Sequence, residues 1–158
     1  MRAKVYIEKT IPSYLAARPS RNLLVAARQQ MTRDWWESRR PDFDLFVSQA
    51  VLEEAEAGDV DLVGKRLALL ADIPVLGVKE GIMELAERFV AEGAIPERAA
   101  ADGLHIAMAT VYGCEYLLTW NCKHIANAEM QRRFRRVARA QGLELPVICT
   151  PEELMGEE

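Results

Sequence analysis

Residues 99–109 read AAADGLHIAMA, and this stretch is apolar on nearly every side when it is drawn as a helix. Pro96 precedes it at a position that suits a first helical turn, and we expect the helix to end near Gly113. A helix of this kind is covered on most of its surface. Asp102 lies within it, and a carboxylate is costly to bury unless it is paired, hydrogen-bonded or bound to a metal ion.

Two answers stay open for what Asp102 faces. The carboxylate can form a buried salt bridge or cap a neighbouring helix, which would make it structural. It can instead belong to a functional site, and that answer requires other acidic residues beside it. The functional answer therefore depends on whether the fold brings other acidic side chains to the same place.

The composition predicts one globular domain over residues 1–158. Half of the residues are hydrophobic and 28% are charged, which is ordinary for a soluble protein of this length. The net charge of −4 does not favour a general nucleic-acid binder. Three irregularly spaced cysteines do not make a disulfide framework, so we expect a reducing, cytoplasmic setting. We see no signal peptide and no apolar run that would cross a membrane.

Strand-like and helix-like segments alternate along the chain, which predicts an α/β fold with a central, mainly parallel sheet flanked by helices. The expected strands are 3–7, 43–47, 74–76, 115–119 and 147–149. The expected helices, besides the one that contains Asp102, are 12–17, 21–39 with Ser20 as its cap, 48–57 with Ser48 as its cap, 59–70, 79–92 and 128–141. In such sheets, functional sites form at the carboxyl ends of the strands.

Acidic and amide side chains occur at these strand ends. Glu8 ends the first strand, Asn121 follows the strand 115–119, and Glu54 lies in the helix after the second strand. Glu53 is the alternative to Glu54, but at about 100° per residue Glu54 falls beside the apolar face of its helix and Glu53 points almost opposite. We therefore expect Glu8, Glu54, Asp102 and Asn121 to converge, with Glu53 in solvent.

Carboxylates gathered in this way favour a hard divalent cation such as Mg²⁺ or Mn²⁺, which takes oxygen ligands and relieves the repulsion between like charges. A bound metal ion lowers the pKa of its water and neutralises charge that develops on phosphate oxygens. Asn121 would bind the ion directly, hold one of its waters or position a phosphate. The hydroxyls of Thr10 and Thr119 lie beside the strand ends and can donate to a carboxylate or satisfy local backbone.

The ordered set of these segments resembles the PIN-domain nucleases and, within them, the VapC-like toxins of bacterial toxin–antitoxin pairs. The likeness covers essentially the whole chain. The motifs that carry it are Glu8-x-Thr10, Ser48 with Glu54-x-x-x-Gly58-Asp59, Ala101-Asp102-x-x-His105-x-Ala107, and Leu118-Thr119-Trp120-Asn121. The resemblance implies a three-layer PIN-like fold with an acidic pocket.

The resemblance also implies an activity and partners. It implies a Mg²⁺- or Mn²⁺-dependent endoribonuclease that cleaves RNA phosphodiester bonds and is held in check by a cognate antitoxin protein. The family's catalytic positions map onto Glu8, Glu54, Asp102 and Asn121, the first three as metal ligands. Glu8 stands where the common pattern has Asp, and Asn121 stands where Asp is frequent. Homodimers are common in the family, and the helix 21–39 offers a contact for one.

A basic segment interrupts this acidic chain. Arginines cluster between residues 132 and 139, namely Arg132, Arg133, Arg135, Arg136 and Arg139, with Lys123 upstream. Either the helix 128–141 presents a solvated face that pairs with acids elsewhere, or Arg132, Arg133 and Arg136 bind the RNA backbone and lead it to the acidic pocket. A nuclease with a negative pocket needs such a surface, which favours the second interpretation.

Other side chains are weaker candidates for functional residues. His105, three residues after Asp102, is expected to be a buried histidine with a hydrogen-bond partner rather than a metal ligand. His124 with Cys122 and Cys114 does not match a structural zinc pattern. Trp120, beside Asn121, is the best candidate among the tryptophans for stacking on a base.

Three functions remain open from the sequence. The first is the PIN-type ribonuclease described above. The second is a PIN-like module that binds RNA or protein with weak or no catalysis, which the neutral Asn121 keeps open. The third is a small α/β phosphatase or hydrolase that uses Asp102 as its nucleophile.

Overall fold

The structure is a computed structural model that describes residues 1–157. Five parallel strands form one sheet in the order β3-β2-β1-β4-β5. The strands are β1 (Ala3–Ile7), β2 (Phe43–Ser48), β3 (Val75–Leu76), β4 (Tyr116–Leu118) and β5 (Val147–Cys149). All five predicted strands are present to within one residue at each end, and the expected parallel arrangement is confirmed.

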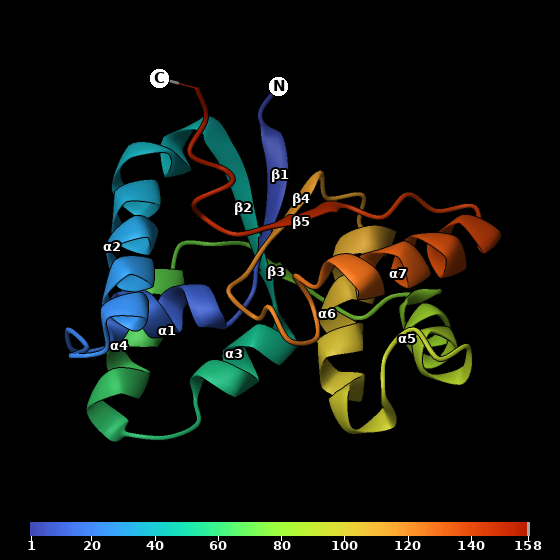
Figure 1. The fold of residues 1–158 in the computed structure, drawn as a ribbon, viewed down its shortest axis with the longest axis horizontal. Coiled ribbons are helices and arrows are strands. Elements are labelled where there is room, and N and C mark those ends of the chain that lie inside the picture. The colour runs from blue at the N-terminus through green and yellow to red at the C-terminus, as the bar shows by residue number, and fades with distance from the viewer. Residues whose placement is uncertain (158) are drawn as a thin grey trace.

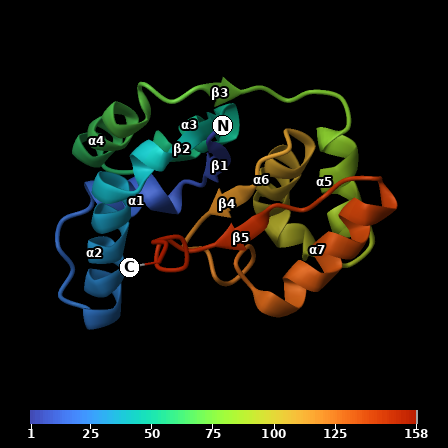
Figure 2. The same ribbon diagram turned by 90° about the horizontal axis from the view of Figure 1, so that it is seen from above.

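Helices cover both faces of this sheet, so the fold has three layers (Figure 1). The helices are α1 (Thr10–Ala16), α2 (Leu23–Ser38), α3 (Gln49–Ala55), α4 (Val60–Leu70), α5 (Ile82–Ala91), α6 (Ala100–Val111) and α7 (Ala128–Ala140), with 3-10 turns η1 (Arg40–Asp42) and η2 (Glu97–Ala99). Figure 2 shows α1, α2 and α4 on one side and α5, α6 and α7 on the other. This division follows from the strand order, because right-handed crossovers place helices on opposite faces when the order reverses direction at β1.

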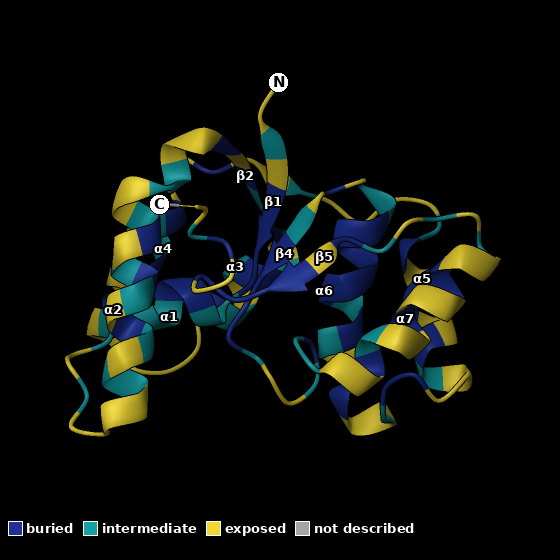
Figure 3. Ribbon diagram, turned by 45° about the horizontal axis from the view of Figure 1, so that its top comes forward, coloured by how far each residue is buried: buried dark blue, intermediate teal, exposed yellow. Residues whose placement is uncertain are grey.

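The helix α6 packs against the sheet and α5, and its position confirms the interpretation of residues 99–109. Seven of its residues, Gly103 and the run from His105 to Thr110, are buried. Figure 3 shows this helix as largely buried beside the buried strands β1 and β4. Its first turn is less covered, since Ala100 and Ala101 are exposed and Asp102 is partly exposed. Asp102 is therefore a side chain at the rim of the core rather than one inside it.

The helix α2 differs from its expected form at its N-terminal end. Its cap is Asn22, whose Oδ1 accepts the backbone N–H groups of Leu24 and Val25, whereas Ser20 accepts the N–H of Asn22. Leu24 is 62% exposed although it lies at the same helical spacing as Trp35, which is fully buried. The core covers this helix only from Gln29 onward, so helical spacing alone predicts more buried residues than the structure contains.

The helix α5 begins three residues later than predicted. Gly81 precedes it with a φ of +91°, a left-handed conformation that glycine adopts without a steric cost. Lys79 therefore lies in the preceding turn, where its carbonyl accepts the N–H of Ile82 at 3.2 Å. Among residues 1–157, no helix is long and apolar enough to cross a membrane.

Candidate active site

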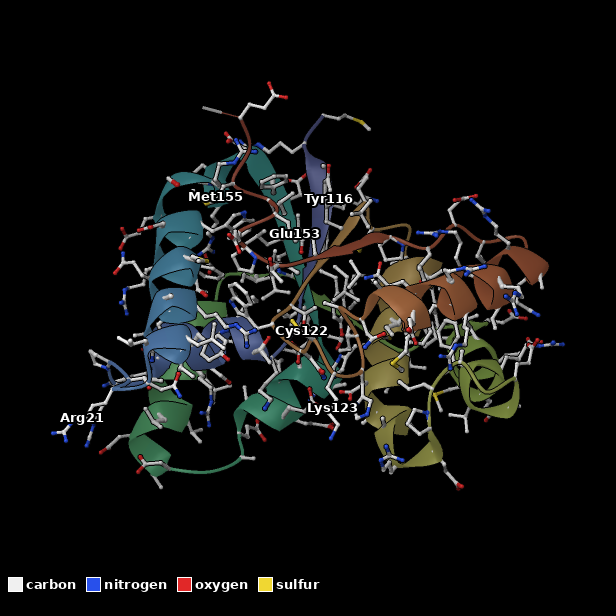
Figure 4. All side chains as sticks on the ribbon, in the orientation of Figure 1. Arg21, Tyr116, Cys122, Lys123, Glu153 and Met155 are labelled. Carbon is white, nitrogen blue, oxygen red and sulfur yellow. The ribbon has the colours of Figure 1, made fainter. Side chains whose placement is uncertain are left out.

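The neighbouring strands β1 and β4 meet at the point where the strand order reverses. The N–H of Glu8, one residue beyond β1, donates to the carbonyl of Leu118 at the end of β4 over 3.1 Å. In open parallel sheets, ligands bind in the crevice that forms outside the carboxyl ends of the strands at such a reversal. Glu8 and Asn121 flank this position in the chain, and Figure 4 shows the loop with Cys122 and Lys123 at the same edge, between α3 and α6.

The Glu8 carboxylate is held by two threonines. Its Oε1 accepts the backbone N–H of Thr10 at 3.1 Å, the hydroxyl of Thr10, and the hydroxyl of Thr119 at 2.6 Å. Glu8 is only 3% exposed, so these donors replace the water that burial removes. All three contacts fall on Oε1, which leaves Oε2 for a further ligand. The possibility that these hydroxyls bind a carboxylate is confirmed.

Glu54 points toward the sheet edge, as its helical position predicts, while Glu53 is exposed. Its Oε1 lies 2.7 Å from Nε2 of His105, and the Glu54 side chain is 32% exposed. The helix that carries it is fixed at both ends. Ser48 Oγ accepts the N–H of Val51 at the start, and the Arg66 guanidinium donates to the carbonyls of Ala55 and Ala57 at the end.

His105 is buried, at 1% exposure, and both of its ring nitrogens have partners, as expected. Nδ1 lies 2.6 Å from the hydroxyl of Tyr6, which lies 2.7 Å from Ser48 Oγ. Burial raises the pKa of the Tyr6 hydroxyl far above its ordinary value, the Ser48 hydrogen bond lowers it, and the charges of Glu54 and Glu8 raise it further. Both carboxylates therefore act on the same buried hydroxyl.

Asp102 faces His124. Its Oδ2 lies 3.4 Å from His124 Nδ1, and the Asp102 side chain is 23% exposed. The partner is therefore an imidazole at the rim of the core, and not the buried Arg or Lys of a structural salt bridge. His124 is placed by Asn121, whose Oδ1 accepts the N–H of His124 at 3.1 Å. The amide oxygen of Asn121 thus orders the loop after β4.

Three of the four predicted site residues, Glu8, Asn121 and Asp102, are linked through intermediate groups rather than through direct contacts, while Glu54 contacts His105. Thr119 connects Glu8 to Asn121, because its hydroxyl oxygen also accepts the N–H of Asn121 at 2.9 Å. Asn121 connects to Asp102 through His124, as described above. Within the part of the chain that the structure describes, no three His, Cys, Asp or Glu side chains lie close enough together to hold a metal ion.

The acidic side chains at this edge have the ligand chemistry that a divalent cation needs. The carboxylates of Glu8, Glu54 and Asp102 provide the oxygen ligands that Mg²⁺ and Mn²⁺ take. Mg²⁺ commonly keeps several waters and binds through one or two carboxylates, so it does not require three of them in direct contact beforehand. The chemistry of these side chains therefore fits such an ion.

Trp120, the best candidate among the tryptophans for stacking on a base, is buried in the core. The indole is 6% exposed, and its Nε1 donates to Thr32 Oγ1 at 2.8 Å. Its ring packs edge-on against Tyr14 and under the guanidinium of Arg28, which lies 5.1 Å from the ring centre. Thr32 supplies the acceptor that a buried indole needs, so Trp120 belongs to the core between β4 and α2.

The arginines of α7 lie on an exposed face, opposite a buried face that includes Phe134 and Val137. Arg133 donates to the carbonyl of Gly93 at 3.3 Å. No ion pair among residues 1–157 involves an arginine of this helix. Pairing with acids elsewhere thus does not account for this face.

Sequence reasoning did not identify Tyr6 as a partner of the acidic site. The signal was present in the strand periodicity, since Tyr6 and Glu8 are two residues apart and side chains at that spacing share a face of the sheet. His105 was placed near Asp102, but its link to Glu54 joins residues 51 positions apart and has no local signature.

Comparisons with known proteins agree with this architecture. No protein-family model and no curated protein matches the chain. The structure of VapBC2 from Rickettsia felis bound to a promoter DNA fragment matches with a TM-score of 0.58 and 14% identity, over 93% of this chain and 98% of that one. The Mycobacterium tuberculosis sarcin-ricin loop cleaving toxin VapC20 matches with a TM-score of 0.54 and 18% identity, over 72% and 86%. With five parallel strands in this order and helices on both faces, the chain has the PIN-domain fold of the VapC-like toxins.

Proposed function

We propose that this protein is a Mg²⁺- or Mn²⁺-dependent endoribonuclease of the PIN type and the toxin of a toxin–antitoxin pair. The observation that carries the proposal is the arrangement of Glu8 and Glu54 at the carboxyl edge of the sheet. Each carboxylate is held by dedicated donors, and both charges act on Tyr6. Asp102 is connected to Glu8 through Thr119, Asn121 and His124, and its contact to His124 is 3.4 Å long.

The side chains would have distinct roles in this reaction. Glu8, Glu54 and Asp102 would hold the ion, with Glu8 offering Oε2, because its other oxygen is occupied by the threonines. A divalent ion would supply an activated water and neutralise charge on the phosphate oxygens. Asn121 would position the loop that faces the substrate, since its amide oxygen already accepts the N–H of His124.

The proposed partners follow from the same comparison and from exposed surfaces. The VapBC2 structure, bound to a fragment of its own promoter, supports an antitoxin partner for this chain. VapC20 is a toxin that cleaves the sarcin-ricin loop, which supports RNA as the substrate class. Leu23 and Leu24, which are 88% and 62% exposed at the start of α2, support a homodimer contact on that helix.

A second candidate function is a PIN-like module that binds RNA or protein without strong catalysis. The absence of three convergent ligands within residues 1–157 favours it, as does the occupied amide oxygen of Asn121. An assay for metal-dependent cleavage separates the two functions.

The test uses mixed single-stranded RNAs with Mn²⁺, with Mg²⁺ and with EDTA. We expect cleavage only with a divalent ion, and a loss in Glu54→Gln of roughly 10²–10³-fold, the size seen when one preorganised electrostatic group is removed. Glu53→Gln is the matched control and should retain wild-type activity, because Glu53 directly precedes Glu54 in the same helix and is exposed.

Equal losses in the two variants would reject Glu54 as a site residue. Binding of RNA without cleavage under every ionic condition would support the second candidate function. Hydrolysis that EDTA does not affect would favour the third interpretation, with Asp102 as a nucleophile.

A further inference from the structure

Four buried or partly buried side chains form one continuous row of hydrogen bonds that ends on Glu54. The row runs from Ser48 to Tyr6 over 2.7 Å, from Tyr6 to His105 over 2.6 Å, and from His105 to Glu54 over 2.7 Å. Ser48, Tyr6 and His105 are each at most 1% exposed. Water is thus excluded from all of the row except its last member.

One direction of the protons in this row satisfies every group with a neutral imidazole. In that direction Ser48 Oγ accepts the N–H of Val51 and donates its own O–H to the Tyr6 oxygen. The Tyr6 O–H then donates to His105 Nδ1, and a neutral His105 carries its proton on Nε2, where it donates to Glu54. The opposite direction needs a proton on both ring nitrogens, so that Nδ1 would donate to the Tyr6 oxygen and Nε2 to Glu54.

Tyr6 is a suitable donor at this position because a phenolic hydroxyl keeps its proton throughout the neutral range, and its oxygen lies 2.6 Å from Nδ1 of His105. A serine or water molecule in its place would be free to rotate. Tyr6 is held in place, since its backbone pairs with β2 and β4 on either side of β1 and its side chain is fully buried. Its oxygen therefore presents a fixed donor to Nδ1.

The row also closes a ring with the helix α3. Ser48 is the N-cap of α3, and Glu54 lies near the C-terminal end of the same helix. Two strands and two helices are joined in this ring, because Tyr6 comes from β1, Ser48 from the end of β2, Glu54 from α3 and His105 from α6. Rotation of the Glu54 side chain away from the sheet edge would break the bond to His105.

We propose that Tyr6, oriented by Ser48, is a positioning residue that holds His105 in its Nε2–H tautomer and thereby holds the Glu54 carboxylate at the site. The effect on RNA cleavage rests on the proposed nuclease function. The tautomer of His105 and the orientation of Glu54 do not depend on that function, because both are properties of the metal-free protein.

The first measurement is the ¹⁵N spectrum of the imidazole rings in the metal-free protein at neutral pH. The chain has two histidines, so a His124→Gln variant assigns both sets of signals. We expect the wild-type His105 to show a protonated Nε2 and an unprotonated Nδ1. In Tyr6→Phe part of the molecules should carry a proton on Nδ1, because Nδ1 has lost the donor that occupies its lone pair while Nε2 still faces Glu54.

Tyr116→Phe is the matched control for this change. Tyr116 lies on the neighbouring strand β4, opposite Val5, and Figure 4 shows it at the end of the sheet away from Cys122. The control should keep the wild-type tautomer. A wild-type His105 that is protonated on Nδ1, or an unchanged tautomer in Tyr6→Phe, would overturn the proposal, and the wild-type spectrum decides this even if the variant does not fold.

The second measurement separates positioning from general stability. We expect Tyr6→Phe to reduce kcat for RNA cleavage and the affinity for Mn²⁺ by about tenfold each, with little change in KM, as is typical when a partner of a metal ligand is removed. Equal losses in Tyr116→Phe would contradict the role of Tyr6. A wild-type protein that cleaves no RNA would reject the proposed function, while the spectrum would still decide the role of Tyr6.

Discussion

Each acidic side chain of the candidate site has its own donor, and the donors differ in how firmly they hold it. Glu8 is fixed by two threonines, and Glu54 by a short contact to His105. Asp102 lies 3.4 Å from His124, beyond the usual length of a strong charge-assisted hydrogen bond. Asp102 is therefore the acid with the most freedom to reorient toward an ion, while the other two are already placed.

The three cysteines differ sharply in their environments, which predicts their reactivity. Burial raises the pKa of Cys114 to about 11 and that of Cys149 to about 12, whereas Cys122 is exposed on the loop after β4. A thiol with a raised pKa stays protonated at pH 8 and reacts slowly, because the thiolate is the nucleophile. We expect one fast-reacting thiol per native chain with a disulfide reagent at pH 8, and all three after unfolding.

Cys122→Ser should remove the fast phase of this reaction and leave the slow ones. Two fast thiols in the native wild-type protein would contradict the burial of Cys114 or Cys149. The slow thiols should react faster as the pH rises toward 11, because the thiolate fraction grows in that direction.

At the scale of the elements, α7 combines a buried apolar face with an arginine-rich exposed face. The helix begins soon after the loop that carries Asn121 and His124, so its basic face continues from the edge where the acids lie. Arginines without acidic partners are available to phosphate groups. This arrangement supports an RNA path that starts on α7.

Replacing Arg132, Arg133 and Arg136 together with Gln tests this path. RNA binding should weaken, and the slope of log K against log salt should become shallower by about 2, since each lost phosphate contact on a single strand contributes about 0.7. The far-ultraviolet circular dichroism should stay native, because the three side chains are exposed. Binding measured at several salt concentrations gives the slope.

A variant of equal charge change serves as the control. Arg2, Arg18 and Arg21 are exposed and lie outside α7, and Figure 4 shows Arg21 on the flank opposite α7. Their replacement with Gln should change the salt slope little. If both triple variants reduce the slope of log K against log salt by the same amount, the effect comes from net charge and not from a path along α7.

At the scale of the whole molecule, the reversal of strand order places acids that are far apart in the sequence along one edge of the sheet, without bringing three of them into contact within residues 1–157. Glu8, Glu54 and Asp102 follow β1, β2 and β3 respectively, and each reaches the same edge because every strand points the same way. A cation bound there would link three separate parts of the fold. Its binding should therefore raise the stability of the entire domain.

Thermal unfolding of the wild type and of Asp102→Asn, each with EDTA and with Mn²⁺, tests this linkage. With EDTA, the variant should melt at or above the wild-type temperature, since one of several like charges is removed and the contact to His124 is long, at 3.4 Å. With Mn²⁺ at about a hundred times its Kd, the wild type should gain about 2.7 kcal/mol. That gain corresponds to roughly 5–10 °C, and the variant should lose most of it.

Asp44→Asn is the control for this experiment, because Asp44 is exposed and its ion pair with Arg2 is long, at 3.9 Å. It should keep the full response to Mn²⁺. A variant of Asp102 that melts well below the wild type in EDTA, together with a wild type that does not respond to Mn²⁺, would reject the metal site and with it much of the nuclease proposal.

Local features of the sequence determined the order and position of the elements. The strand 3–7 and the capping role of Ser48 were predictable because hydrophobic periodicity and side-chain caps act over a few residues. The helical period also separated Glu54 from Glu53, since neighbours in a helix point in different directions. The expected convergence at the carboxyl ends of the strands follows from parallel topology alone.

Only the tertiary structure decided which side chains meet. Trp120 is a candidate for stacking on a base when the sequence is considered alone, but Thr32, 88 positions away, offers its indole an acceptor inside the core. Tyr6 and His105 are 99 positions apart, and nothing in either segment specifies the other. Contacts of this kind depend on how whole elements pack, because a buried polar group takes whichever partner the folded chain places beside it.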